Sequence, residues 1–197
     1  MVKRDSKATR QRILEQAATL LNTAGYLSTS VSDIMRVTGL KKGGIYHHFK
    51  SLEDLALEAF QYAVGRVQAR ILDVIGNNAP AKEKLLALIA IFRNLPFDDV
   101  LRGGCPIANL AIETDHTRSR LRGAAAQAME KLLLCFQHVI EEGMTQQAFV
   151  KGDARAHAAE IIAALEGGLM LSNLYRDYTY LHGVADQLEA RVKAGLR

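Results

Sequence analysis

The residues best suited to chemistry lie within residues 41–47, directly after a glycine-centred turn. A helix that enters the major groove of DNA needs cationic and hydrogen-bonding groups at its exposed N-terminal end, and glycines permit close backbone approach. The segment therefore favours DNA binding, while an ordinary helical hairpin with a solvated basic face stays open as the alternative. The set comprises Lys41, Lys42, Gly43, Gly44, Tyr46 and His47.

Two short helices joined by a tight turn are predicted to position this set. We expect the first helix over residues 31–37, with Ser30 as its N-cap and Asp33 completing a capping box. Thr38, Gly39 and Leu40 make the turn, and a second helix runs from Lys41 to about His48. The inward-facing residues that hold the two helices together are Ile34, Val37, Leu40, Ile45 and Phe49.

Charge is concentrated at the start of the chain. Residues 1–50 hold nine basic and three acidic residues, whereas the whole chain has 25 basic and 21 acidic residues and a net charge of +4. A basic first quarter joined to a slightly acidic remainder indicates a polyanion-binding module on a separate body. A solvated charged surface is the alternative that charge alone leaves open.

Composition excludes several classes of protein. With 197 residues, 49% of them hydrophobic, the chain is long enough for one or two packed domains. Two cysteines cannot make a disulfide framework, and zinc-ligand spacing is absent, so we expect neither a metal nor a cofactor. The longest apolar run, Leu85 to Phe92, is too short for a membrane span, and residues 1–12 are too polar for a secretory signal. A cytoplasmic protein without membrane contacts is expected.

Helical periodicity continues along the rest of the chain. Ile13, Ala17, Leu21 and Ala24 fall on one face of a helix that Gly25 ends, and Ser51 with Asp54 caps a long helix that follows. Strand signals are weak, so we predict an all-α fold of nine helices. The remaining helices are expected over residues 81–94, 106–114, 118–142, 153–178 and 181–194.

The helix expected over residues 153–178 is apolar almost all round. Such a helix must be buried on two sides, so we predict that one side faces its own domain and the other a partner subunit. Burial entirely within one chain is the alternative. The residues predicted at the dimer interface are Ala163, Ala164, Gly167, Gly168, Leu171 and Tyr175.

Cys105 is predicted at the N-cap of a helix with Pro106 at its first position. The helix dipole there favours a thiolate, so the thiol is a candidate electrophile sensor, but a small residue in a tight pocket wall is the preferred interpretation. An enzyme with Cys105 as nucleophile and His116 as helper lacks a base-and-orienter pattern, so we expect no enzyme. Cys135 lies in an apolar helical run and is expected in the core.

The stretch TRQRILEQAATLLNTAGYLSTSVSDIMRVTGLKKGGIYHHFKSLEDL resembles the N-terminal domain of TetR/AcrR-type transcriptional repressors. The resemblance covers about 50 residues and is specific, because order, spacing and residue types agree. It implies a TetR-like architecture with a helix-turn-helix domain over residues 1–51 and a ligand-binding and dimerisation domain over residues 52–197.

The resemblance also implies which residues meet DNA. Ser and Thr side chains near the first short helix would meet phosphates, and the second helix would read the operator. One departure is Leu52, where the family often has a lysine, and Lys50 is the candidate substitute. The implied DNA-binding residues are Thr29, Ser30, Ser32, Lys41, Lys42, Gly43, Tyr46, His47 and Lys50.

The resemblance further implies a homodimer that binds a pseudo-palindromic operator and releases it when a small-molecule inducer binds. A repressor is therefore predicted, and a non-specific architectural DNA protein is the alternative. The implied pocket walls are Phe92, Cys105, Ile107, Leu110, Met129, Leu133, Phe136 and Met170. The polar residues that would orient the ligand are Glu113, Glu166 and Asn173.

Overall fold

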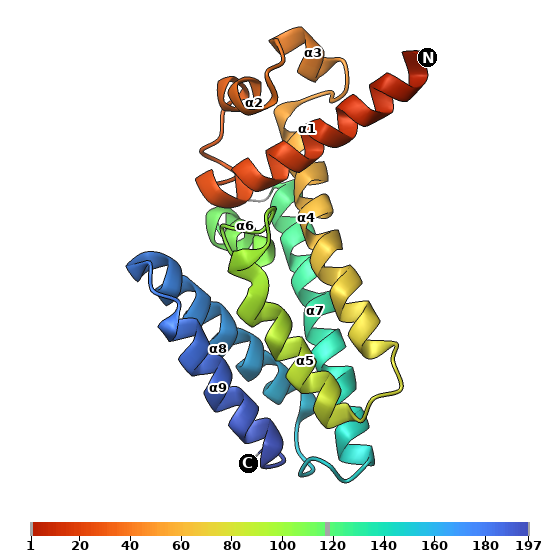
Figure 1. Cartoon of the computed structure of the whole chain (residues 1–197), viewed down its shortest axis with the longest axis vertical. Helices are drawn as coiled ribbons and strands as arrows, with labels where there is room; N and C mark the ends of the chain where they lie inside the picture. The colour runs from red at the N-terminus through yellow and green to blue at the C-terminus, as the bar shows by residue number, and fades with distance from the viewer. Residues whose placement is uncertain (1, 117–118, 197) are drawn as a thin grey trace. The chain divides into compact units, whose positions relative to one another are not determined.

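The computed structural model describes residues 2–116 and 119–196, and the side chains from residue 6 onward. Those residues form nine α-helices and one short 3-10 helix, η1 (Leu95–Phe97), with no strand among them, which confirms the predicted all-α class. The helices, labelled in Figure 1, are α1 (Val2–Ala24), α2 (Val31–Thr38), α3 (Lys42–Tyr46), α4 (Leu52–Ile75), α5 (Ala81–Asn94), α6 (Pro106–Thr114), α7 (Arg120–Thr145), α8 (Ala154–Tyr175) and α9 (Thr179–Lys193).

The helices divide into two compact units. Unit 1 comprises the described residues of 1–66 and 96–126, and therefore contains α1, α2, α3, the first part of α4, α6 and the start of α7. α2 packs on both α1 and α3. The core of unit 1 is formed by apolar side chains that are almost fully buried, among them Ile13, Leu21, Ile34, Leu55 and Phe60.

Unit 2 comprises residues 67–95 and the described residues of 127–197. α8 and α9 lie side by side and run in opposite directions (Figure 1), and α5 packs against α9. Its core includes Leu85, Leu88 and the rings of Phe92 and Phe136, whose centroids lie 6.0 Å apart edge to face.

Several helix boundaries agree with those predicted from the sequence. α5 and α6 have the predicted bounds, and the predicted start of α7 at Arg118 lies outside the described residues. α8 is shorter than predicted because Arg176 adopts a left-handed conformation (φ 54°) and its N–H bonds to Ser172 O, which ends the helix at Tyr175.

Hydropathy along the described helices bears on membrane contact. Within residues 2–116 and 119–196, no helix combines the length and the apolar character that a bilayer crossing requires.

Candidate functional site

The helix-turn-helix begins at a capping box. Ser30 Oγ accepts a hydrogen bond from Asp33 N at 3.3 Å, and Asp33 Oδ2 accepts one from Ser30 N at 3.0 Å, as predicted. The Ser30 hydroxyl also donates to Asp33 Oδ2 at 2.6 Å. This bond, followed by those from Ser30 N and from Arg36, lowers the pKa of Asp33 to about 2. α2 ends at Gly39, which has a φ of 69° and donates its N–H to Met35 O. This left-handed conformation, which glycine adopts without strain, forms the predicted turn.

Three of the five residues predicted to face inward in the helix-turn-helix are buried. Ile34, Ile45 and Phe49 are buried, whereas Val37 and Leu40 are only half-buried. Thr38, predicted only as a turn residue, is buried and donates its hydroxyl to Ile34 O at 2.7 Å. A threonine at the end of an amphipathic helix is an expected place for such a bond, because its hydroxyl can reach the carbonyl one turn back.

α3 presents the predicted polar set to the surface. Lys41, Lys42, Gly43 and His47 are exposed, and Tyr46 is 40% exposed, with Lys42 Nζ 5.9 Å from the centre of its ring. The predicted helix over residues 41–48 is too long: α3 has five residues and His47 is its C-cap. Two consecutive glycines weaken helix propagation, which accounts for the short helix.

The predicted phosphate contacts divide into two groups. Ser30, Ser32 and Lys50 are exposed. Thr29 is 5% exposed, and its hydroxyl donates to Gly25 O at 2.6 Å. Its side chain therefore stabilises the corner before α2, and its contact with a phosphate stays a prediction.

Arg10 of α1 contacts both α4 and Phe49, which lies at the end of the helix-turn-helix. Its guanidinium forms an ion pair with Glu58 of α4 and lies 4.8 Å from the centre of the Phe49 ring. His48 is half-buried beside it. Burial, followed by the nearby His47 and Arg10, lowers the pKa of His48. His48 thus belongs to the packing of the domain.

The start of α4 is held by local and distant contacts. Ser51 Oγ accepts from Asp54 N at 3.0 Å, and Arg120 Nη1 donates to Asp54 Oδ1 at 2.8 Å. Hydrogen bonds from Arg120 and Ser51 lower the pKa of Asp54. Leu52, where the resemblance implies a lysine, is half-buried, and the neighbouring Lys50 is exposed.

The predicted ligand residues fall in both units. Cys105, Ile107, Leu110 and Glu113 belong to unit 1, and the other seven to unit 2. Phe92, Phe136, Ile107 and Leu110 are buried in their own cores, whereas Met170 and Asn173 are exposed on α8. A common pocket for these residues stays a prediction. The half-buried members are Glu113, Met129, Leu133 and Glu166.

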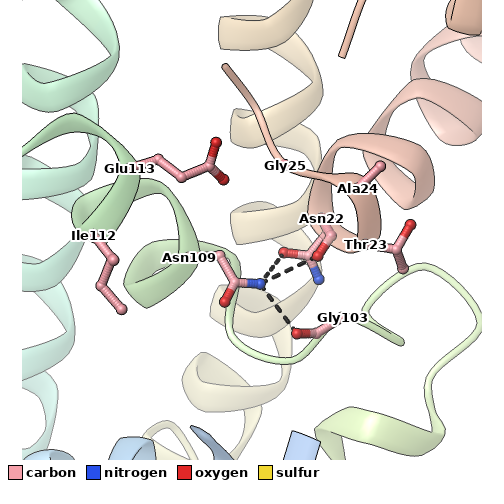
Figure 2. Close-up of a pocket in the computed structure, with 8 residues that line it drawn as sticks. All are labelled: Asn22, Thr23, Ala24, Gly25, Gly103, Asn109, Ile112 and Glu113. Carbon is pink, nitrogen blue, oxygen red and sulfur yellow. Dashed lines mark hydrogen bonds between the residues drawn. The ribbon is translucent and has the colours of Figure 1, made fainter. Parts of the chain in front are cut away.

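Glu113, predicted as a ligand contact, forms hydrogen bonds to the backbone of its own chain. Its carboxylate accepts hydrogen bonds from Tyr26 N at 3.0 Å and Leu27 N at 2.9 Å, in the corner between α1 and α2. Glu113 also lines a cavity of about 330 Å³ in unit 1, shown in Figure 2. The other lining residues are Asn22, Thr23, Ala24, Gly25, Gly103, Asn109 and Ile112.

Cys105 takes the predicted N-cap position of α6, with Pro106 directly after it. Its side chain makes no capping hydrogen bond and is 2% exposed, so an electrophile has no direct access to the thiol. Cys135, predicted in the core, is only half-buried, and burial raises the pKa of its thiol.

The predicted dimer residues lie on different faces of α8. Ala163 and Tyr175 are exposed, and Ala164, Gly167 and Leu171 are half-buried. Gly168 is buried against α9 of the same chain, because a Cβ there would lie 3.2 Å from Val184 Cβ. We therefore correct Gly168 from an intersubunit contact to an intrachain one.

Exposed apolar side chains continue along α8 and onto α9. Met170, Leu174 and Tyr175 are 56%, 69% and 61% exposed, and Tyr180 of α9 stacks on Tyr175 with a centroid distance of 5.3 Å. We call this set the α8–α9 apolar face. Exposed apolar patches of this kind are typical of protein–protein interaction sites.

Comparisons with known proteins cover both parts of the chain. Residues 13–59 match "Bacterial regulatory proteins, tetR family", and residues 81–188 match "Tetracyclin repressor-like, C-terminal domain". The second match alone spans more than half of the chain.

Individual relatives agree over nearly the full length. An HTH-type transcriptional regulator of Mycobacterium tuberculosis is 31% identical in an alignment of 196 positions that covers 95% of each chain. The HTH-type transcriptional regulator LmrA of Bacillus subtilis is 28% identical and covers 87% of this chain and 90% of its own. A crystal structure of a TetR transcriptional regulator from Chloroflexus aurantiacus is 36% identical, with a TM-score of 0.87 over 96% of both chains. All three are described as transcriptional regulators, not as enzymes.

Proposed function

The chain belongs to the TetR family of transcriptional regulators, and from this premise we propose that it is a homodimeric repressor of a pseudo-palindromic operator. A small-molecule inducer would release the operator by favouring a state in which the two recognition helices no longer match the operator spacing. The site of action would be the cytoplasm, where the operator DNA lies.

The observation that carries the proposal is the exposed polar surface of α3. Lys42 of α3 and the two residues that cap this helix, Lys41 and His47, are exposed. α3 packs on α2, and Ile34 of α2 and Ile45 of α3 are both buried. Cationic side chains on a rigid, exposed helix are suited to phosphate and base-edge contacts in the major groove. Ser32 is exposed at the start of α2, where its hydroxyl would donate to the phosphate backbone. Ser30 is also exposed, but its hydroxyl donates to Asp33 Oδ2 at 2.6 Å.

The α8–α9 apolar face supports the homodimer. Leu174 and Tyr175 would be buried if a second copy packed its own α8 and α9 against them as a four-helix bundle. A two-fold dimer presents two recognition helices, and therefore reads two half-sites of inverted sequence.

The proposed inducer is expected to bind among apolar side chains. Within unit 2, the edge-to-face rings of Phe92 and Phe136 and the half-buried Met129 and Leu133 are candidate walls for an apolar ligand. Met170 is better assigned to the dimer, because 56% of its surface is exposed on α8.

Selection of bound duplexes from a random DNA library by the purified protein tests the proposal. We expect enrichment of one inverted repeat, protection of that repeat alone in a footprint, and reduced transcription from a promoter that overlaps it. Enrichment of no sequence, with protection along the whole duplex, would instead favour a non-specific architectural protein. Increased transcription would identify an activator.

A further inference from the structure

The corner between α1 and α2 is held by a carboxylate from a helix far away in the sequence. Residues 25–30 lead from the end of α1 to the N-cap of α2, and Glu113 of α6 accepts hydrogen bonds from two consecutive N–H groups in this corner, those of Tyr26 and Leu27. Hydrogen bonds to an ionised acceptor are stronger than those between neutral groups. The position at which α2 begins is therefore tied to α6.

The geometry of Gly25 makes room for this carboxylate. Gly25 has a φ of 101°, which turns the chain out of α1, and a Cβ at this position would lie 3.2 Å from Glu113 Oε2. A side chain at residue 25 would crowd this carboxylate and would also collide with the Ser28 hydroxyl, 2.5 Å from its Cβ. Glycine at this position avoids both contacts and tolerates the positive φ.

A second set of hydrogen bonds lies one helical turn away on α6. Figure 2 shows the Asn109 amide directed at Asn22 and Gly103, with Nδ2 donating to Asn22 Oδ1 at 3.0 Å and to Gly103 O at 3.1 Å. Asn22, 4% exposed, donates in turn to Gly104 O at 2.9 Å. Since Asn109 and Glu113 are four residues apart, one face of α6 holds the last turn of α1 and the corner together.

The corner is also anchored by apolar contact. Tyr26 is 4% exposed, and its ring meets Phe60 of α4 edge to face at 6.0 Å. Glu113 therefore binds the backbone of Tyr26, and Phe60 packs against the ring of the same residue. A shift of α6 cannot leave the corner in place unless these bonds break.

We propose that Glu113 and Asn109 are positioning residues for DNA recognition, which make α6 part of the rigid body that carries the helix-turn-helix. They touch no DNA; they act by fixing α1, the corner and α2, and hence the direction in which α3 points. The inference rests on the proposed function, since it assumes that α3 reads an operator. It extends the DNA-binding body beyond residues 1–51 to include residues 103–113.

Glu113→Gln tests the inference, because the substitution is nearly isosteric but leaves only one oxygen to accept two N–H groups. Removal of a negative charge alone should strengthen binding to DNA. We expect the opposite: operator affinity falls by about tenfold or more, a typical size for coupling between sites. The slope of log K against log[salt] should stay unchanged, because no phosphate contact is lost.

Asp115→Asn is the matched control, since Asp115 is an exposed carboxylate directly after α6 that contacts only His116 among the described ion pairs. Its operator affinity should equal or exceed that of the unmodified protein. Hydrogen exchange at the amides of Tyr26 and Leu27 should be faster in Glu113→Gln and unchanged in Asp115→Asn.

Equal affinity of the two variants would overturn the positioning role. If Glu113→Gln does not fold, Asn109→Ala decides by the same two measurements. If the unmodified protein binds no operator, the proposed function fails. Unchanged hydrogen exchange at Tyr26 and Leu27 in Glu113→Gln would instead refute the role of Glu113 in holding the corner. The two failures are thus distinguishable.

Discussion

The backbone of Gly103 packs directly on the carbonyl of Asn22, so closely that a Cβ on residue 103 would collide with it. Asn22 lies in the last turn of α1, and Gly103 lies in the loop before α6. The contact brings together segments 81 residues apart in the sequence. Close backbone contact of this kind requires glycine at the contact point.

Gly103→Ala should therefore destabilise unit 1. The new methyl group meets backbone atoms that cannot rotate away, and overpacking of this kind typically costs about 1–3 kcal/mol. Urea denaturation followed by circular dichroism measures the loss. Gly123→Ala in α7 is the control, because nothing lies within 4 Å of its Cβ, and it should stabilise the helix by about 0.5–1 kcal/mol. Equal stability of the two variants would contradict the packing argument.

Lys42→Ala should weaken operator binding and change its salt dependence. Lys42 is exposed on α3 and is proposed to contact a phosphate. Loss of one contact per subunit should reduce the slope of log K against log[salt] by about 0.9 for each contact. Fluorescence anisotropy at several salt concentrations measures the slope. Lys151→Ala, at an exposed position between α7 and α8, should leave it unchanged, and an unchanged slope for Lys42→Ala would remove this lysine from the interface.

Local signals made the helix-turn-helix predictable. The capping box of Ser30 and Asp33 and the positive φ of Gly39 depend on residues within a few positions of one another, so their spacing alone indicates the structure. The full length of α3 was less predictable, since two glycines after Lys42 allow the helix to end early.

Contacts between distant segments were not predictable in the same way. Glu113 is a polar residue on an apolar helix, a pattern that fits a ligand contact and a backbone clamp equally well. Thr29 and Gly168 show the same difficulty: whether each faces solvent or its own chain depends on where the next helix packs. Periodicity reports that α8 is apolar on several sides, but it does not report which side α9 covers.

Leu174→Glu should produce a folded monomer. Leu174 is 69% exposed, so a carboxylate there costs little in the single chain, but it would be buried without a partner in the proposed dimer. Sedimentation velocity should show the mass of one chain with unchanged helicity. Leu134→Glu is the matched control, because Leu134 is 49% exposed on α7, outside the α8–α9 apolar face, and it should remain dimeric. A dimeric Leu174→Glu would place the interface elsewhere.

Gly168→Glu should behave differently from Leu174→Glu. Its side chain would meet Val184 and Leu181 of α9 within the same chain, so the fold itself should be lost together with the dimer. Circular dichroism separates the two cases, since only Gly168→Glu is expected to lower helicity or the thermal midpoint. A well-folded Gly168→Glu monomer would restore Gly168 to the subunit interface.

Acidification should destabilise the DNA-binding unit through His48. Burial and the neighbouring His47 and Arg10 lower the pKa of His48 in the folded state, so its stabilising contribution is complete above the unfolded value of about 6.5. As the pH falls below that value, the unfolded chain takes up the proton first and the free energy of unfolding decreases until the lowered folded pKa is reached. Asp33 and Asp54, whose pKa values are also lowered, add their own loss only below about pH 4.

Urea titrations between about pH 8 and pH 5 should therefore show a decline that His48→Gln reduces. His116→Gln is the control, because the His116 side chain is 95% exposed and its removal should leave the decline as it is. At the high end of this pH range, the difference in stability between His48→Gln and the unmodified protein reports the packing of the side chain at residue 48. The steepness of the decline as the pH falls reports proton uptake. If His48→Gln and the unmodified protein lose stability in parallel, His48 is not the group that titrates.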